Sequence, residues 1–475
     1  MDRLWKYISA DALHDSLARS PPPRCHPGTR EIVLRKIYSW IDEPNPRQRI
    51  VWLNGPAGTG KTAVAQTVAE HCNGKQLAAS FFFKRNTKGR GVVDCLFLTL
   101  AWQLATSIPE TRPYLESVLK ADRLLHTKSI DVQFNQLFVQ VFQKLLRDKP
   151  NLHPEKTLVI IDGVDECAPE RDQRHFLNLI GDSLASDGIP LHFLLSSRSE
   201  FQIRETFNME KIENTVFALA LDDTFAPNDD IRRYLEDKFL DIFTNRQVSP
   251  LPTDADIDYL VLKASGQFIY ASTIVKFIDD DDCNPKEQLA IILKNLKLRS
   301  INLSSPYAPL DELYIQVLSQ QRDTRLLRDI FVLIIALGRP DWVFICRRLQ
   351  EIKEDLVIKL RRLSSLLQIS DSGIETYHQS LHDFFLDKSR AGKYYIHPAR
   401  VTLVRLPRNA RRFVEKIAIV RSEVGILRVV LIAGRLLLAP LFVVPGVCIG
   451  LVCGCNGRWQ FSPACLYITF LCPIG

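Results

Sequence analysis

Short apolar runs typical of buried strands alternate with helical patterns in the first half of the chain. The runs are Ile50–Asn54, Thr157–Asp162 and Leu191–Ser197, and their aliphatic content favours strands that are covered on both faces. A helical pattern over Glu31–Ile41 precedes the first run, and another over Ala63–Ala69 follows it. This alternation predicts an α/β fold built on a doubly wound parallel sheet.

The second half of the chain is patterned mainly as helices. Helical spacing covers Asp230–Phe243, Asp254–Ala264, Phe268–Ile278, Arg328–Leu337 and Asp355–Leu367. A short strand-like segment, Leu367–Ser370, follows the last of them. A polar, turn-forming stretch at residues 222–228 separates the two halves. Because 475 residues exceed what one hydrophobic core usually supports, we expect two or three domains.

A glycine-rich loop joins the first strand to the helix that follows it. Its residues are Gly55, Pro56, Ala57, Gly58, Thr59, Gly60, Lys61 and Thr62. The glycines let the backbone fold tightly around an anion, and the N–H groups at the helix N-terminus then point at it. In this motif the lysine reaches the β- and γ-phosphates of a nucleoside triphosphate, and the threonine hydroxyl binds Mg²⁺. The alternative is a glycine-rich turn without a ligand, but the flanking strand and helix both favour a phosphate-binding loop.

Acidic residues lie at the end of the second strand. Asp162 is its last residue, and Asp165 and Glu166 follow closely. Phosphoryl transfer needs a carboxylate near Mg²⁺ and a group that orients the attacking water. We therefore predict that Asp162 holds the metal and that Asp165 or Glu166 positions or activates water. The alternative is an acidic turn that simply ends a core strand.

Arg198 directly follows the third strand. Ligands of open α/β sheets bind at the carboxyl edge of the strands, where this arginine and Asp162 would both lie. We predict that Arg198 senses or stabilises the γ-phosphate. The alternative is the solvated end of a strand.

The order of these motifs resembles the NACHT class of signalling NTPases, within the STAND group that includes apoptosome and plant-resistance ATPases. The match looks closest to the nephrocystin-like NACHT proteins of mushroom-forming fungi. The segments that carry it are Pro21–Arg30, the P-loop, Leu77–Phe83, Asp162–Glu166 and Leu194–Glu200. The resemblance extends over about residues 10 to 400.

This resemblance implies a switch that is closed with ADP and opens for assembly with ATP. It implies bound ATP or ADP with Mg²⁺, self-association on activation, and a preference for ATP over GTP. It also implies a winged-helix-like domain in which His378 contacts the β-phosphate of ADP. The acidic residue that usually follows this histidine is Gln379 here. The alternative for His378 is a locally paired histidine at a helix N-terminus. Thr29 or Arg30 would contact the base.

Pattern and resemblance together predict five segments. They are a lead segment at 1–30, a P-loop NTPase domain at 31–220, a helical domain at 221–305, a winged-helix-like domain at 306–400 and a hydrophobic, basic tail at 401–475.

The tail differs from the rest of the chain in charge. Nine Lys or Arg and two acidic residues give residues 401–475 a net charge of +7, which equals that of the whole chain, so residues 1–400 are neutral. A neutral core does not indicate nucleic-acid binding. Residues 436–455 carry no charge and follow basic residues, which is typical of a membrane segment. The alternatives are a buried helical extension and an incorrectly joined gene-model end.

Without an N-terminal signal peptide, and with scattered cysteines, the sequence favours the cytoplasm. The leading functional hypothesis is a switch that binds and slowly hydrolyses ATP. The alternatives are a turnover NTPase and a degenerate nucleotide-binding scaffold.

Overall fold

The computed structural model describes residues 4–406, apart from 44–45, 153, 155–156, 187–188, 222–224, 299–306 and 322. By its internal contacts the chain divides into Met1–Val401 and Thr402–Gly475, and the fold below is that of the first unit. The uncharged segment 436–455 and the cysteines of the tail lie outside the described residues. None of the helices in the described part has both the length and the apolarity that crossing a bilayer requires.

A five-stranded parallel sheet forms the centre of the first half of the chain. Its spatial order is β2 (Leu77–Phe82), β3 (Leu158–Asp162), β4 (His192–Ser197), β1 (Ile50–Asn54) and β5 (Val216–Ala220). All neighbouring strands are parallel. The predicted α/β fold is confirmed, and the three predicted strands are β1, β3 and β4. Because the strands are parallel, the segments that follow β1, β3 and β4 all emerge at the carboxyl edge of the sheet.

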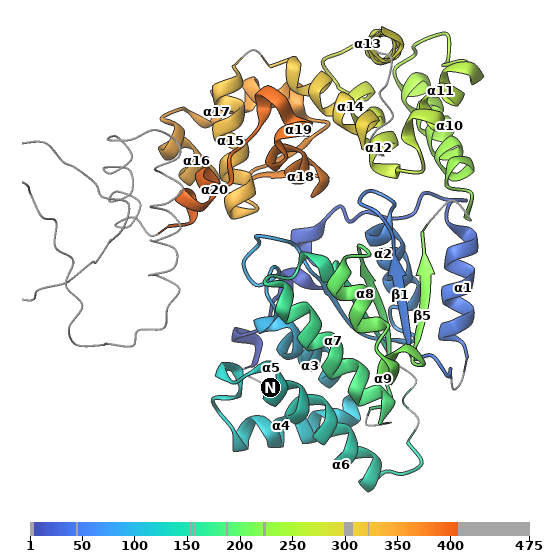
Figure 1. The fold of residues 1–475 in the computed structure, drawn as a ribbon, viewed down its shortest axis with the longest axis vertical. Helices are drawn as coiled ribbons and strands as arrows, with labels where there is room; N and C mark the ends of the chain where they lie inside the picture. Colours follow the sequence, from blue (N-terminus) through green and yellow to red (C-terminus); the bar gives the residue numbers. More distant parts are fainter. Residues whose placement is uncertain are drawn as a thin grey trace, which may run out of the picture. The chain divides into compact units, whose positions relative to one another are not determined.

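Helices cover both faces of this sheet (Figure 1). One face carries α1 (Glu31–Ile41) and α2 (Lys61–Cys72), which share a buried apolar cluster with β1, β3 and β4. The other face carries the remaining helices of this half. They are α3 (Leu96–Ser107), α4 (Arg112–Ala121), α5 (Ile130–Phe134), α6 (Gln140–Asp148), α7 (Glu170–Ala185), α8 (Phe201–Phe207) and α9 (Glu210–Glu213).

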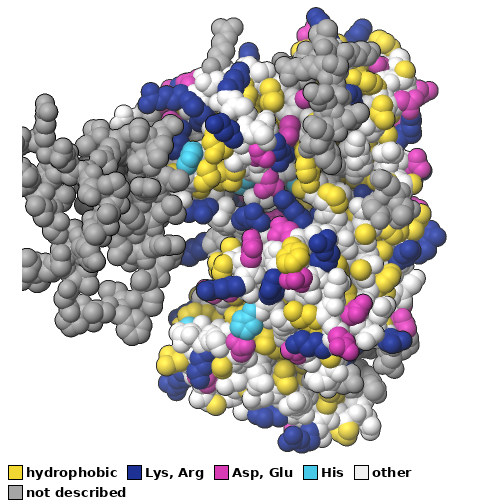
Figure 2. Space-filling model, in the orientation of Figure 1, with side chains coloured by type: hydrophobic (Ala, Val, Ile, Leu, Met, Phe, Trp, Pro, Cys, Tyr) yellow, Lys and Arg dark blue, Asp and Glu magenta, His cyan; other side chains and the backbone are white. Residues whose placement is uncertain are grey.

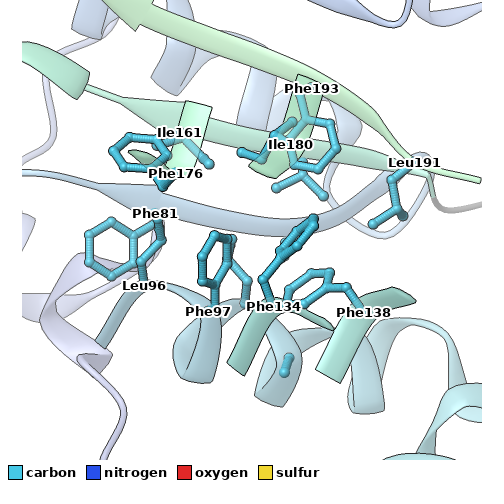
Figure 3. Packing of buried hydrophobic residues seen from close by; sticks show 14 of the residues in the cluster. Phe81, Leu96, Phe97, Phe134, Phe138, Ile161, Phe176, Ile180, Leu191 and Phe193 are labelled. Carbon is cyan, nitrogen blue, oxygen red and sulfur yellow. The ribbon is translucent and has the colours of Figure 1, made fainter. Parts of the chain in front are cut away.

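The core on this second face is rich in aromatic side chains (Figure 3). Phe81 of β2 lies near Phe97, whose ring centroid is 4.8 Å from that of Phe134. Phe134 in turn stacks on Phe138, with their centroids 5.2 Å apart. Aromatic contacts of this kind add to the free energy of burying each ring. They hold the helices of this layer against the sheet.

The lead segment packs against the NTPase core. It forms three short 3₁₀ turns, Leu4–Lys6, Ala10–Ala12 and Leu17–Arg19. The Ser9 N–H donates to Thr99 Oγ1 at 2.9 Å, and the His14 N–H donates to Ser80 Oγ at 3.1 Å. Contacts with α3 and β2 therefore order a segment that is too short to fold alone.

The second half begins with four helices. They are α10 (Pro227–Asn245), α11 (Asp254–Ala264), α12 (Phe268–Ile278) and α13 (Pro285–Leu298). Helix α11 begins at a capping box, in which the Thr253 hydroxyl accepts from the backbone N–H of Asp256 and the Asp256 carboxylate accepts from the backbone N–H of Thr253. The next helices are α14 (Ala308–Ser319), α15 (Thr324–Leu337), α16 (Trp342–Leu349) and α17 (Lys353–Leu360).

An antiparallel hairpin follows these helices. Its strands are β6 (Leu367–Ser370) and β7 (Gly373–Thr376). Helices α18 (Ser380–Leu386), α19 (Lys388–Ala391) and α20 (Pro398–Arg405) end the described chain. The predicted helix over Asp355–Leu367 is wrong at its end, because α17 stops at Leu360 and a 3₁₀ turn leads into the hairpin. Two serines follow that turn, and serine is a weak helix former. The domain boundaries at residues 30, 220 and 305 stay predictions.

Candidate functional site

The glycine-rich loop connects the buried end of β1 to the first turn of α2. Gly58 and Gly60 have φ angles of +81° and +94°, a region that favours glycine. A Cβ added to Gly58 would lie 2.2 Å from Cγ2 of Ile269, so only glycine allows α12 to approach the loop. A Cβ added to Gly60 would meet no atom within 4 Å. The loop therefore closes against α12 on one side and faces open space on the other.

Lys61 lies in this loop as the first residue of α2. Its Nζ donates to the carbonyl oxygens of Gly55 at 2.7 Å and Pro56 at 2.8 Å. Burial lowers the pKa of Lys61 to about 8, with Asp165 acting in the opposite direction. A desolvated ammonium with two neutral acceptors favours an added anion, which would restore its pKa. The loop therefore fits a phosphate group.

Asp162 lies buried at the carboxyl end of β3 and accepts hydrogen bonds from two hydroxyl groups. Ser196 Oγ donates to its Oδ1, and the Thr62 side chain donates as well. Burial raises the pKa of Asp162, and both hydroxyl donors oppose that change. A carboxylate with adjacent hydroxyl oxygens is the hard oxygen set that Mg²⁺ prefers. The residues fit a magnesium ion, and Ser196 is a neighbour that the sequence motif did not indicate.

Asp165 and Glu166 differ in their partners. Asp165 is buried and accepts from the Arg198 backbone N–H at 2.9 Å. It also forms an ion pair with the Arg198 side chain, with Oδ2 3.3 Å from Nε. Glu166 Oε2 accepts from the backbone N–H of Arg85 at 3.1 Å. Burial and the neighbouring Asp165 charge raise the pKa of Glu166 to about 7. Asp165 is thus paired with Arg198, whereas Glu166 can exchange a proton near neutral pH.

Arg198 links the sheet edge to the second half of the chain. Besides Asp165, its side chain contacts Asp383 of α18, with Nη1 2.8 Å from Oδ2. Burial lowers the pKa of Arg198, but Asp383 and Asp165 more than offset this and raise it overall. The arginine predicted for the γ-phosphate is therefore engaged by two carboxylates.

His378 lines the same cavity as Lys61 and Asp162. Its Nδ1 accepts the backbone N–H of Ser380 at 3.0 Å and lies 2.7 Å from Ser380 Oγ. Because Nδ1 is an acceptor, the neutral ring carries its proton on Nε2. Burial, Arg198 and Lys61 lower the pKa of His378 to about 3. The ring is therefore a neutral donor rather than a cation, and it is also locally paired.

The two residues predicted to contact the base, Thr29 and Arg30, lie close to the P-loop. Arg30 is buried, and its Nη2 donates to the Thr59 carbonyl oxygen at 2.8 Å. Its guanidinium lies 4.9 Å from the centroid of the Phe268 ring. Thr29 is also buried and lines the cavity. Arg19, which the sequence did not single out, lies 3.5 Å from the Phe82 ring centroid and lines the cavity too.

Two further contacts join the loop after β2 to the later helices. Lys84 and Glu375 of β7 form an ion pair, and Glu375 is buried. Asn86 Nδ2 donates to the Ile335 carbonyl oxygen at 3.0 Å. The cavity of about 630 Å³ is accordingly lined by residues from both halves of the chain.

The surface shows no large field of one charge on the face drawn in Figure 2. Lys and Arg side chains are interspersed there with Asp and Glu, and apolar side chains are scattered between them. This mixture agrees with the neutral charge of residues 1–400.

One family model matches the P-loop part of the chain. Residues 28–198 match the family model described as nephrocystin 3, N-terminal. No curated protein matches the chain. Similar solved structures include Cdc6p from Pyrobaculum aerophilum, with 13% identity and a TM-score of 0.35 over 78% of this chain and 96% of that one. Another is the Aeropyrum pernix Orc1 protein in complex with DNA, with 14% identity and a TM-score of 0.32 over 74% and 90%. The chain is thus similar to the nephrocystin 3 N-terminal family over the segment that holds the P-loop, Asp162 and Arg198.

Proposed function

We propose that this protein is a nucleotide-controlled switch of the NACHT type within the STAND group. It would bind ATP or ADP with Mg²⁺ and hydrolyse ATP slowly. The observation that supports the proposal most strongly is that Lys61 and His378, which come from different halves of the chain, line the same cavity. A site built from both halves of the chain lets a ligand bias their arrangement, because a contact made in only one state stabilises that state.

The phosphate-side roles follow from the donors and acceptors present. Lys61 and the backbone of Gly55–Thr62 would bind the β- and γ-phosphates. Thr62 and Asp162 would hold Mg²⁺, which neutralises phosphate charge when bound. Glu166 would accept a proton from, or orient, the attacking water, since its pKa lies near neutrality.

Asp165 and Arg198 would act together in this proposal. The side chain of Arg198 forms one ion pair with Asp165, which follows β3, and another with Asp383 of α18 in the second half of the chain. When Arg198 turns to a γ-phosphate, it would exchange the carboxylate of Asp383 for an oxygen of the ligand. The ion pair with Asp383 would then mark the closed state, and its loss would accompany opening and self-association.

His378 would bind the nucleoside diphosphate in the closed state. A neutral ring with its proton on Nε2 can donate one hydrogen bond to a phosphate oxygen. Thr29 and Arg30 would lie at the base, with ATP preferred over GTP by family resemblance. A cytoplasmic location belongs to the same proposal.

The competing functions are a turnover NTPase and a degenerate scaffold. Nucleotide carried through purification, identified by chromatography, and the steady-state rate of ATP hydrolysis separate the three. Retained ADP with slow turnover supports the switch. Rapid turnover would favour the enzyme, and a protein purified with an empty site that binds added nucleotide only weakly would favour the scaffold.

A further inference from the structure

We propose that Lys276 of α12 is a second phosphate-binding lysine, which binds the phosphate chain of the nucleotide from the side opposite the P-loop. The proposal rests on the nucleotide binding proposed above. It adds a contact that lies outside the matched segment 28–198 and outside every motif recognised in the sequence.

Helix α12 presents one stripe of side chains to the cavity. Ile269, Ser272 and Lys276 all line it, and spacings of three and four residues place them on one helix face. The start of the stripe is fixed to the P-loop, because the Ile269 N–H donates to the Gly58 carbonyl oxygen at 3.1 Å.

The direction of the lysine side chain brings its charge back towards the loop. Lys276 lies two turns, about 10 Å, along the helix axis from Ile269. Long side chains on a helix lean towards its N-terminus. The N-terminus of α12 is the end that contacts the P-loop, so this tendency directs the side chain of Lys276 along the cavity that it lines, where its Nζ lies over the ring of Tyr377.

The ammonium of Lys276 is held by a ring and not by a carboxylate. Its Nζ lies 3.0 Å from the centroid of the Tyr377 ring, and Tyr377 directly precedes His378. No carboxylate lies within ion-pair distance of it in the described part of the chain. Burial lowers the pKa of Lys276 to about 8. A desolvated cation without a counter-ion is costly, and an anionic ligand relieves that cost.

The acidic turn that follows α12 does not supply the missing partner. Arg246 Nη2 lies 3.4 Å from Asp279 Oδ1 and 2.9 Å from Asp281 Oδ1. Arg361 Nη1 lies 3.0 Å from Asp282 Oδ2. The carboxylates of Asp279, Asp281 and Asp282 are therefore paired with arginines. Asp280 Oδ2 instead accepts from Ser364 Oγ at 3.3 Å. Lys276 borders a pocket with this turn but forms no ion pair with it among the described residues.

Other cationic side chains that line the cavity already have carboxylate or carbonyl partners. Arg24, Lys84 and Arg198 form ion pairs with carboxylates, and Arg30 and Lys61 donate to carbonyl oxygens of the P-loop. Lys276 thus differs from them in having only an aromatic contact among the described residues. Lys276, the P-loop and His378 line one cavity of about 630 Å³, which can hold a chain of phosphates.

The test compares affinities of Lys276→Met and the parent for ADP, ATP and adenosine. The control is Lys263→Met, since Lys263 of α11 also lies over a tyrosine ring, 5.4 Å from the Tyr259 centroid, but does not line the cavity. Loss of one charge-assisted contact should weaken ADP and ATP binding by roughly ten- to a hundredfold and leave adenosine binding unchanged. The Lys263→Met variant should bind like the parent.

Two further variants separate phosphate binding from a structural role. Tyr377→Phe keeps the ring and should keep ADP affinity, whereas Tyr377→Leu should lower it. The melting temperature of nucleotide-free Lys276→Met should not fall, since the lysine lacks a carboxylate partner.

Equal ADP affinity of Lys276→Met and the parent, in a protein whose Lys61→Ala variant loses ADP, would overturn this inference and leave the proposed function intact. A parent protein that binds no nucleotide would instead overturn the proposed function. An equal loss of adenosine and ADP affinity would assign Lys276 to the nucleoside and also overturn the proposal.

Discussion

The two sides of the cavity are built in different ways. On the P-loop side, Lys61 follows β1 after the glycine-rich loop, Asp162 ends β3 and Arg198 directly follows β4. Backbone hydrogen bonds fix the parallel register of these strands. On the opposite side, His378 and Asp383 come from a loop and a short helix of the later half. The first side is held by main chain over a buried core, whereas the second is joined to it through individual side chains.

This difference indicates which side can move. The contacts across the cavity include the ion pairs Arg198–Asp383 and Lys84–Glu375. Breaking a small number of such contacts costs far less than unpairing a strand from the sheet, because each contributes only a few kcal/mol. We therefore expect the P-loop side to bind nucleotide in every state and the second side to respond to which nucleotide is present.

The largest expected effect on nucleotide affinity comes from a substitution on the P-loop side of the cavity, which we call the fixed side; the side that carries His378 and Asp383 is the movable side. Lys61→Ala removes the ammonium that the loop holds at the carbonyl oxygens of Gly55 and Pro56. It should weaken triphosphate binding at least tenfold, since a charge-assisted bond contributes about 1.5–3 kcal/mol. Titration with a fluorescent ATP analogue measures this. Lys75→Ala, an exposed lysine beyond the end of α2, is the control and should bind like the parent. Unchanged affinity of Lys61→Ala would remove the P-loop from the mechanism.

On the movable side, His378→Ala removes a neutral donor to the diphosphate. We expect ADP to dissociate about tenfold faster, from the loss of a hydrogen bond to a charged acceptor. Stopped-flow displacement of labelled ADP reports the rate. His397→Ala, an exposed histidine before α20, should leave the rate unchanged. Equal rates for His378→Ala and the parent would exclude contact of this histidine with nucleotide.

A smaller effect is expected from the ion pair that joins the two sides. Asp383→Asn keeps the shape of the side chain but weakens its pairing with Arg198 and should favour the open state several-fold. Light scattering in the presence of ATP measures the resulting self-association. Asp371→Asn alters an exposed carboxylate of the hairpin turn and serves as the control. Identical scattering of all three proteins would show that the ion pair does not hold the closed state.

The smallest effect concerns the pH dependence of stability at Glu166. Its pKa is raised to about 7 in the folded protein, so folding favours the protonated form and this contribution is lost as the pH rises from 4.5 through 7. Glu166→Gln removes the ionisation, and its melting temperature relative to the parent should therefore increase between about pH 5 and about pH 8. Thermal unfolding without nucleotide gives the comparison. A constant difference across this range would contradict the raised pKa.

The sequence predicted the fixed side of the site better than the movable side. A P-loop, the acid after β3 and the arginine after β4 can be placed from local patterns, because parallel strands bring their carboxyl ends to one edge. The Lys276–Tyr377 and Lys84–Glu375 contacts join segments about a hundred to three hundred residues apart in the sequence. No local periodicity encodes such pairs, and His378 was indicated only by family resemblance.

For the fold too, the sequence predicted local elements better than contacts between distant segments. Helices α1, α11 and α12 have the bounds that their apolar spacing predicts. The lead segment had no periodic pattern, and its place beside β2 and α3 comes from tertiary hydrogen bonds to Ser80 and Thr99. Arg19 therefore became a cavity residue that the sequence alone could not identify.

The central claim, that the second side closes over a bound diphosphate, is tested most directly by hydrogen exchange of the backbone amides from Thr376 to Leu386. In the parent protein, ADP should slow exchange in this segment, and a non-hydrolysable ATP analogue should slow it less. In Lys61→Ala, the same ADP concentration should give little protection. Equal exchange in the parent with ADP, with the analogue and without nucleotide would contradict the claim.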